Sequence, residues 1–339
     1  MRSWILPGCL LLPLITACGG RGARTAPLET VPALALPRVQ PSPAADGADP
    51  GVEAVSLFGQ PLAPPPLSPE IQADREARLA AARAEAEAHP DDVDALIWLG
   101  RRTAYLGRYR EAIDLYTRGL EKHPDEPRLL RHRGHRYISI RRFDLAIADL
   151  ERAAGLIAGK PDEVEPDGLP NARNIPVSTL QTNVWYHLGL AYYYLGDLPN
   201  AERAFRECLQ VSKNADMQVA TIHWLYMILR RLGRVGEAAE LLAPIRTDMD
   251  VIENRSYHWL VLMYKGEIPA DSILSLAGQE GLDPATLGYG VGNWHLYNGR
   301  RDEAVKAFRQ VLAGDQWSAF GYIAAEADLK RLGEALNTD

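Results

Sequence analysis

The 339-residue sequence has little cysteine and lacks the common catalytic signatures. Its three cysteines, Cys9, Cys18 and Cys208, are too few and too far apart for a disulfide framework. It contains no G-x-S-x-G, no P-loop, no C-x-x-C and no H-E-x-x-H segment. An enzyme would therefore need a site outside these motifs, and we expect neither a catalytic residue nor a cofactor.

An excess of positive charge is also absent, because the net charge is −7. This gives no reason to expect a nucleic-acid partner. The exception is residues 128–142, which contain no acid. His132 and His135 in this segment have a spacing that suits two metal ligands. However, six arginines surround them and would repel a cation, so we favour an exposed basic helix without metal. The six are Arg128, Arg131, Arg133, Arg136, Arg141 and Arg142.

The N-terminal apolar run is too short to cross a bilayer, which takes about 20 residues. Residues 1–17 have a positive start and a short apolar stretch, as secretory signal peptides do. Residues 15–18, Ile-Thr-Ala-Cys, resemble the lipobox of bacterial lipoproteins. The resemblance implies lipidation, including palmitate, at Cys18. Because Gly19 follows rather than Asp, it also implies the periplasmic face of the outer membrane in the cell envelope. The alternative is an ordinary cleaved signal peptide.

Residues 18–67 are predicted to be a disordered Pro/Ala-rich linker. Ten of the 24 prolines fall between Pro27 and Pro66, and no helical or strand period is present. Such a segment cannot bury enough surface to offset its chain entropy. A tether of this length reaches about 40 Å if flexible and about 150 Å as polyproline II. The apolar patch at residues 55–58 could dock on another surface, but we favour an unstructured patch.

The rest of the chain is periodic. His89-Pro90 and His123-Pro124 are separated by 34 residues, and this is the period of the tetratricopeptide repeat. The repeat that begins near Thr182 matches best at repeat positions 4, 7, 8, 11, 15, 20, 24 and 27. The matching residues are Trp185, Leu188, Gly189, Tyr192, Gly196, Ala201, Phe205 and Cys208. The sequence thus resembles tetratricopeptide repeat proteins, which implies an all-α fold, a superhelix or α-solenoid, over residues 68–339.

The residue pattern supports the same fold on physical grounds. Positions 4, 7, 8 and 11 form one face of a first helix, and positions 17, 20, 24 and 27 one face of a second. Glycine at position 15 suits a left-handed turn. Cys208 falls at a packed position and is interpreted as a buried inert thiol rather than a nucleophile. Repeats are expected near 93–126, 127–160, 182–215, 219–252, 253–282 (degenerate) and 285–318, with a half-repeat cap at 68–90 and a capping helix at 318–333.

In tetratricopeptide repeat domains, positions 2, 5, 9, 12 and 13 of the first helices line the ligand groove. Arginine and tyrosine dominate these positions here, and they suit a peptide that carries carboxylates and apolar side chains. The alternative is a solvated wall without a ligand. The residues carried over are Arg101, Tyr105, Arg128, Arg131, His135, Tyr186, Tyr193, Tyr194, His223, Arg230 and Arg231.

Residues 161–181 are an insertion between the second and third repeats, and such long loops are often functional. Its acids are Asp162, Glu163, Glu165 and Asp167. They could bind calcium, although the spacing is not that of an EF-hand. They could instead remain solvated or fold back onto the arginine-rich segment 128–142.

These observations favour a membrane-anchored extracytoplasmic scaffold or adaptor that binds a protein or peptide partner through its concave groove. One alternative is a binder of a non-protein ligand, a glycan or cofactor, along the aromatic wall. The other is an enzyme that uses the 161–181 loop.

The lipobox generates a direct prediction. Replacing Cys18 by Ser removes the only group that can carry the acyl chains, so the protein should move from the membrane to the soluble fraction. Fractionation followed by immunoblotting measures this, with Cys9→Ser as the control that should stay on the membrane. Membrane association that survives Cys18→Ser would reject lipidation at this residue.

Overall fold

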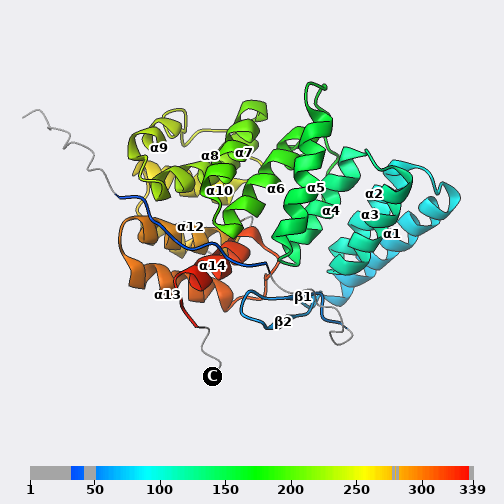
Figure 1. Ribbon diagram of the computed structural model, residues 1–339, viewed down its shortest axis with the longest axis horizontal. Coiled ribbons are helices and arrows are strands. Elements are labelled where there is room, and N and C mark those ends of the chain that lie inside the picture. Colours follow the sequence, from blue (N-terminus) through cyan, green and yellow to red (C-terminus); the bar gives the residue numbers. More distant parts are fainter. Residues whose placement is uncertain (1–31, 42–50, 277–278, 280–281, 336–339) are drawn as a thin grey trace, which may run out of the picture.

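The computed structural model describes residues 32–41, 51–276, 279 and 282–335. The predicted signal peptide and Cys18 lie outside the described residues. Figure 1 shows helices stacked in antiparallel pairs, from α1 at one end of the array to the last repeats at the other. No helix in the described ranges is long and apolar enough to span a bilayer.

The all-α prediction is confirmed, since the described chain consists of helices and one short antiparallel hairpin. The hairpin strands are β1 (Ala54–Val55) and β2 (Pro61–Leu62). The helices are α1 (Pro69–Ala88), α2 (Val93–Tyr105), α3 (Tyr109–Lys122), α4 (Pro127–Ser139), α5 (Phe143–Ile157), α6 (Leu180–Leu195), α7 (Leu198–Val211), α8 (Ala215–Arg231), α9 (Val235–Leu241), α10 (Arg255–Lys265), α11 (Ala270–Ser275), α12 (Pro284–Tyr297), α13 (Arg301–Leu312) and α14 (Phe320–Arg331).

The helices pair from α2 and α3 to α12 and α13, while α1 and α14 stand alone, and α6, α8 and α12 begin before the repeat ranges expected from the sequence, at Leu180, Ala215 and Pro284. The two helices of a pair approach closely at the small residue of position 8. In the third repeat, a Cβ on Gly189 would lie 2.7 Å from the ring of Phe205. Only glycine therefore lets α6 and α7 pack at this distance.

The turns inside the pairs use left-handed backbone at position 15. Gly196 ends α6 with φ +86°, as the repeat pattern predicts. The second repeat has Arg141 there, with φ +63°. A residue with a side chain costs about 1–2 kcal/mol in this conformation, so Arg141 requires compensation from its own contacts.

Arg141 finds that compensation at the other end of the chain. Its side chain is fully buried and donates hydrogen bonds to the Glu326 carboxylate of α14, at 2.7 and 2.9 Å. It also donates to the carbonyl oxygens of Trp317, at 2.8 Å, and Ser139, at 2.6 Å. The superhelix thus closes on itself, since the second repeat holds the last helix.

A second buried cluster fixes α14 on the concave side of the C-terminal repeats. Asp328 of α14 accepts from Arg231 of α8, at 3.0 Å, and from the Tyr289 hydroxyl of α12, at 2.9 Å. Although burial opposes it, the pKa of the Asp328 carboxyl is lowered by Arg231 and Arg331. Helix α14 also packs against α6, α12 and α13, so it occupies the inside of the superhelix.

Two stretches of the predicted linker lie on the helices. In residues 32–41, the Leu34 amide donates to the Arg231 carbonyl at 2.7 Å, and Val39 is 5% exposed. Figure 1 shows this stretch running along the array beside α14.

The second stretch, residues 51–67, contains the hairpin. The Leu57 amide donates to Glu326, and the Trp317 indole donates to the Ala63 carbonyl at 2.7 Å. The preference for an unstructured patch at residues 55–58 is therefore wrong. Leu57 is 8% exposed because α14 and the segment before it provide an apolar surface and a buried carboxylate.

The Arg141 contacts predict a large stability effect. Glu326→Gln leaves a buried guanidinium without a counter-charge, and we expect a loss of about 3–5 kcal/mol in the free energy of unfolding. Urea unfolding followed by circular dichroism measures it. The control is Glu334→Gln, because Glu334 pairs with Arg301, whose side chain is 51% exposed, and should cost less than about 1 kcal/mol. Equal losses for the two variants would contradict this role of Arg141.

Candidate functional site

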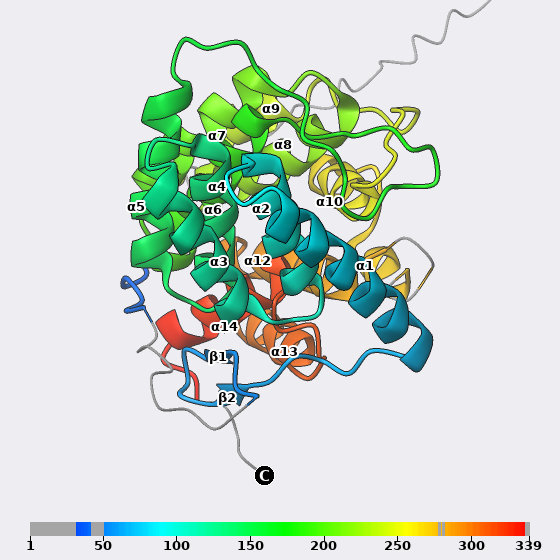
Figure 2. The ribbon, with the colours of Figure 1, turned by 90° about the vertical axis from the view of Figure 1, so that its right-hand side faces the viewer.

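The insertion between α5 and α6 crosses the concave face of the N-terminal repeats. We call residues 161–179 the strap. Its base is closed by an antiparallel bridge between Val164 and Thr179 and by a hydrogen bond of 2.8 Å from the Leu180 amide to the Glu163 carbonyl. Figure 2 shows the strap running from the end of α5 across the front of the array toward α10.

Helix α2 holds the strap through its main chain. Arg101 donates to the Pro166 carbonyl at 2.8 Å, and Arg102 donates to the Gly168 carbonyl at 2.9 Å. The backbone passes so close to α2 that a Cβ on Gly168 would lie 1.7 Å from the Tyr105 hydroxyl. The predicted groove residues Arg101 and Tyr105 therefore lie against the strap.

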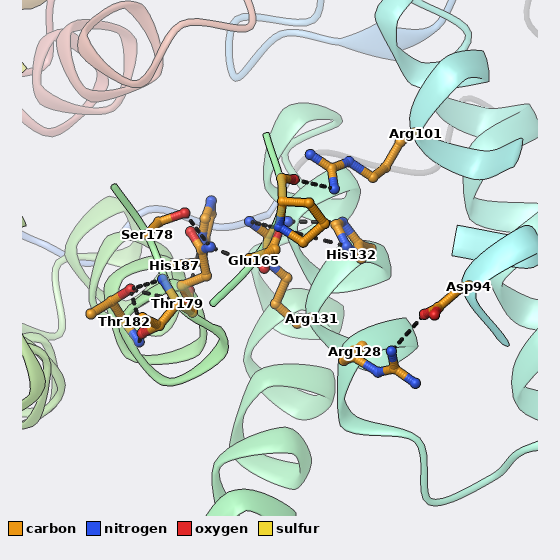
Figure 3. A network of polar contacts seen from close by, with 12 residues as sticks. Asp94, Arg101, Arg128, Arg131, His132, Glu165, Ser178, Thr179, Thr182 and His187 are labelled. Atoms are coloured by element: carbon orange, nitrogen blue, oxygen red, sulfur yellow. Dashed lines mark hydrogen bonds and ion pairs between the residues drawn. The ribbon is translucent and has the colours of Figure 1, made fainter. Parts of the chain in front are cut away.

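Glu165 is the centre of the polar network in Figure 3. Its carboxylate lies 3.0 Å from the Arg131 guanidinium of α4 and accepts from the Asn183 amide of α6, also at 3.0 Å. The two charged side chains are only 13% and 9% exposed. Charge-assisted contacts of this kind are strong when water is excluded. The interpretation that the acidic loop folds back onto the arginine-rich segment is confirmed.

The histidines of this region are held neutral. Burial, followed by the positive charge of Arg131, lowers the pKa of His132 well below its usual range. Burial and nearby arginines do the same for the pKa values of His135 and His187. The His132 ring lies 3.7 Å from the Glu165 carboxylate. Arg131 is therefore the cation that binds this carboxylate near pH 7.

The strap acids do not converge on one point. Glu165 binds Arg131, whereas Asp162 accepts a hydrogen bond from the backbone N–H of Gln181 at 3.0 Å. Throughout the part of the chain that the structure describes, no group of three or more His, Cys, Asp or Glu side chains is placed to hold a metal ion. The strap acids act as structural partners in this arrangement.

An open groove remains beside the strap, between α1, α2 and α4. It comprises two adjoining clefts of about 410 and 250 Å³ that share Asp94 and Trp98. The guanidinium carbons of Arg101 and Arg102 lie 4.4 and 4.8 Å from the Trp98 ring centroid. The groove therefore combines a half-buried aromatic surface with arginine side chains, and acidic side chains such as Asp92, Asp94 and Glu163 also line it.

Sequence reasoning missed Trp98 because it is at repeat position 6, outside the groove positions carried over from the family. One signal was present in the sequence. The apolar face of α2 is formed by Leu96, Leu99, Gly100 and Thr103, so a tryptophan off this face needs another explanation.

The predicted groove residues separate into three sets. Arg101, Tyr105, Arg128 and Arg131 lie together in the N-terminal half, although Arg131 is buried beneath Glu165. Arg128 pairs with Asp94 at 2.6 Å and with Glu126 at 2.9 Å.

His135 and Arg230 lie apart from that group. His135 contacts His187, with ring centroids 4.2 Å apart and ring planes tilted by 42°, and lines a separate central cavity of about 270 Å³. Arg230 lies over the Tyr297 ring at 4.3 Å, toward the C-terminal repeats.

The prediction that the remaining five residues line an open groove is wrong. The cause is α10, α12 and α14, which fill this part of the concave face and convert it into core. The five are Tyr186, Tyr193, Tyr194, His223 and Arg231, with 6%, 0%, 0%, 0% and 2% exposure.

Specific contacts show how complete this conversion is. The Tyr193 hydroxyl lies 2.5 Å from that of Tyr289 on α12. The Tyr194 hydroxyl donates to the Phe320 carbonyl at 3.2 Å, at the start of α14. These side chains stabilise the fold and do not form an accessible surface.

Comparisons with known proteins agree with the repeat pattern. Two family models described as tetratricopeptide repeat match residues 100–162 and 182–215. A comparison with curated protein sequences finds no match.

Among solved structures, the chain resembles YrrB, described as a TPR protein with an unusual peptide-binding site. The two are 15% identical over 73% of this chain and 97% of that one, with a TM-score of 0.40. A tetratricopeptide repeat protein from Parabacteroides merdae is 17% identical, with coverage of 76% and 93% and a TM-score of 0.44. The TPR-like repeats of a putative kinesin light chain from Podosopora anserina are 18% identical, with coverage of 68% and 97% and a TM-score of 0.39.

The burial of His223 predicts a pH dependence. Burial lowers its pKa to about 3, against about 6.5 in the unfolded chain. The unfolded state therefore takes up a proton first as the pH falls. The contribution of the buried, neutral His223 to the free energy of unfolding is present above pH 6.5. It decreases below this pH, by about 1 kcal/mol between pH 7 and 5.5.

Urea unfolding at the two pH values should show a smaller pH effect in His223→Gln than in the parent. His89→Gln is the control, because this side chain is 60% exposed and its replacement should leave the pH effect unchanged. A pH effect that is the same in His223→Gln and the parent would mean that His223 is accessible to solvent.

Proposed function

We propose that this chain, which contains tetratricopeptide repeats, is a membrane-anchored extracytoplasmic scaffold that binds a protein partner through the N-terminal half of its concave face. One observation carries the proposal. Trp98, with Arg101 and Arg102 against its ring, lies in a groove that neither the strap nor α14 fills. The repeat fold is one that commonly serves as a protein-interaction scaffold.

The chemistry of the groove suits a peptide. Tryptophan and arginine are the residue types that most often dominate binding energy at protein interfaces. The walls also carry Arg78 and Arg128 on either side of the Trp98 ring. An extended segment with an apolar side chain on Trp98 and a neighbouring carboxylate would satisfy both features.

Anchoring through Cys18 is the second part of the proposal and is supported by the lipobox resemblance. The described chain begins on the helical array at residue 32. The intervening residues 19–31 number thirteen (31 − 18) and span at most about 45 Å when extended. An anchored protein would thus hold residue 32, and with it the helical array, close to the lipid surface, which favours partners in the same membrane.

The structure favours this function over the two alternatives raised by the sequence. A glycan or cofactor on the aromatic wall would need access to Tyr193 and Tyr194, and both are fully buried. An enzyme using the 161–181 loop would need several acids converging on one point, but Glu165 is paired with Arg131 and Asp162 accepts from the backbone N–H of Gln181.

The groove assignment predicts that Trp98→Ala weakens partner capture about tenfold or more. The measurement places a photo-reactive amino acid at Ala82, which lines the groove, and quantifies the cross-linked adduct in whole cells. Trp294→Ala is the matched control, because Trp294 is another half-buried tryptophan with an arginine, Arg300, 4.0 Å from its ring centroid. Equal adduct yields in both variants would place the partner elsewhere.

A further inference from the structure

The strap segment from Glu163 to Gly168 lies across α2 and α4 in the manner of a bound peptide, directly beside the Trp98 groove. We propose that it is an internal ligand, which an extended acidic segment of the partner replaces. In the exchange, a carboxylate of the partner takes the place of Glu165 on Arg131 and Asn183. This inference rests on the proposed function and adds the chemistry of the partner and its competitor.

The contacts of the strap backbone are of a kind that any extended peptide can make. Arg101 and Arg102 bind two main-chain carbonyl oxygens, those of Pro166 and Gly168, at 2.8 and 2.9 Å. Such contacts recognise an extended backbone and do not depend on the side chains of the bound segment. The α2 arginines would hold another extended segment as well as they hold this one.

Specificity comes from the carboxylate. The Arg131 side chain is 9% exposed, and its charge is balanced by Glu165 at 3.0 Å. Within the described ranges, its Nε atom has no hydrogen-bond partner. A buried guanidinium cannot be left without a counter-charge at low cost. The pocket therefore accepts the exchange of one carboxylate for another, which selects for an acidic partner.

The strap is mostly exposed outside these contacts, and Val177 is its one buried apolar side chain, 6% exposed, with a carbonyl that accepts from the Asn214 side chain at 2.8 Å. Among the described residues, five large apolar side chains are exposed, and three of them belong to the strap: Val164, Leu169 and Ile175, at 66%, 56% and 44%. The ion pair between Arg173 and Asp250 has side chains that are 47% and 74% exposed, and such pairs contribute little in water. The strap can therefore leave without exposing much core, because most of its apolar surface is already in solvent.

The closed base of the strap allows a clean deletion. Val164 and Thr179 face each other in an antiparallel bridge, so a two-residue Asn-Gly turn can join them. Replacing residues 165–178 by Asn-Gly removes Glu165 and keeps the Thr179 cap of α6. This strapless variant, as the full chain in detergent, has an open Arg131 pocket.

The probe is a fluorescent peptide with the sequence of residues 162–168, blocked at both ends. By anisotropy, the strapless variant should bind it at least tenfold more tightly than the intact chain. A peptide with Gln in place of Glu165 should lose most of this affinity, as should Arg131→Gln in the strapless background. A strapless variant that keeps its thermal transition but binds neither peptide, or binds both equally, would show that the strap is a fixed structural element and overturn the inference.

A milder pair of variants keeps the test decisive if the deletion prevents folding. Glu165→Gln should increase peptide binding and speed hydrogen exchange at the amides of residues 163–168. Glu163→Gln, an exposed acid of the same strap, should do neither. Identical behaviour of the two variants would also overturn the inference.

The peptide-binding experiment can fail independently of the cross-linking test of the proposed function. If the peptide fails to bind while Trp98-dependent cross-linking persists, only the internal ligand is rejected. If cross-linking does not depend on Trp98 but the peptide binds the strapless variant, the Trp98 groove is rejected as the partner site and the Arg131 pocket remains a carboxylate site.

Discussion

The buried ion pair between Arg141 and Glu326 is the contact on which the shape of this molecule depends. Arg141 occupies a left-handed turn position that suits glycine, and its guanidinium is completely buried. Both features are costly alone. They are sustained because Glu326, the Trp317 carbonyl and the Ser139 carbonyl surround the guanidinium with acceptors. These acceptors come from the second repeat and from the C-terminal helix with the segment before it, so satisfying one side chain requires the superhelix to close.

Closure decides which surface can bind a partner. An open superhelix of tetratricopeptide repeats would present its concave wall along the whole array. Here α14 fills the C-terminal part, where Asp328 meets Arg231 and Tyr289. The hairpin at residues 51–67 reinforces the closure, because Leu57 contacts the same Glu326. The proposed partner site therefore lies in the N-terminal half, where Trp98 lines an open groove and the strap covers Arg131.

The two covered regions differ in a way that matters for function. Over α6 and α8 the cover is a helix with a fully buried acidic and aromatic network, which is part of the core. Over α2 and α4 the cover is an extended segment with one buried carboxylate and several exposed apolar side chains. Replacing the first would unfold the C-terminal repeats, whereas replacing the second exchanges one set of polar contacts for another. This contrast is the reason for placing the partner site at the strap end.

The sequence by itself determined the helix pairs, because their packing is local. Gly189 meets Phe205 and Gly196 makes its turn within one repeat of 34 residues, and periodicity reports such contacts directly. The return of the strap onto the basic helix was also readable, since Glu165 and Arg131 are close in sequence and opposite in charge. The burial of Tyr193, Tyr194 and Arg231 was decided only by the tertiary structure. Their partners Tyr289, Phe320 and Asp328 are roughly 100 residues away in the sequence. A repeat pattern predicts how neighbouring repeats stack, but it does not predict how strongly the superhelix curves.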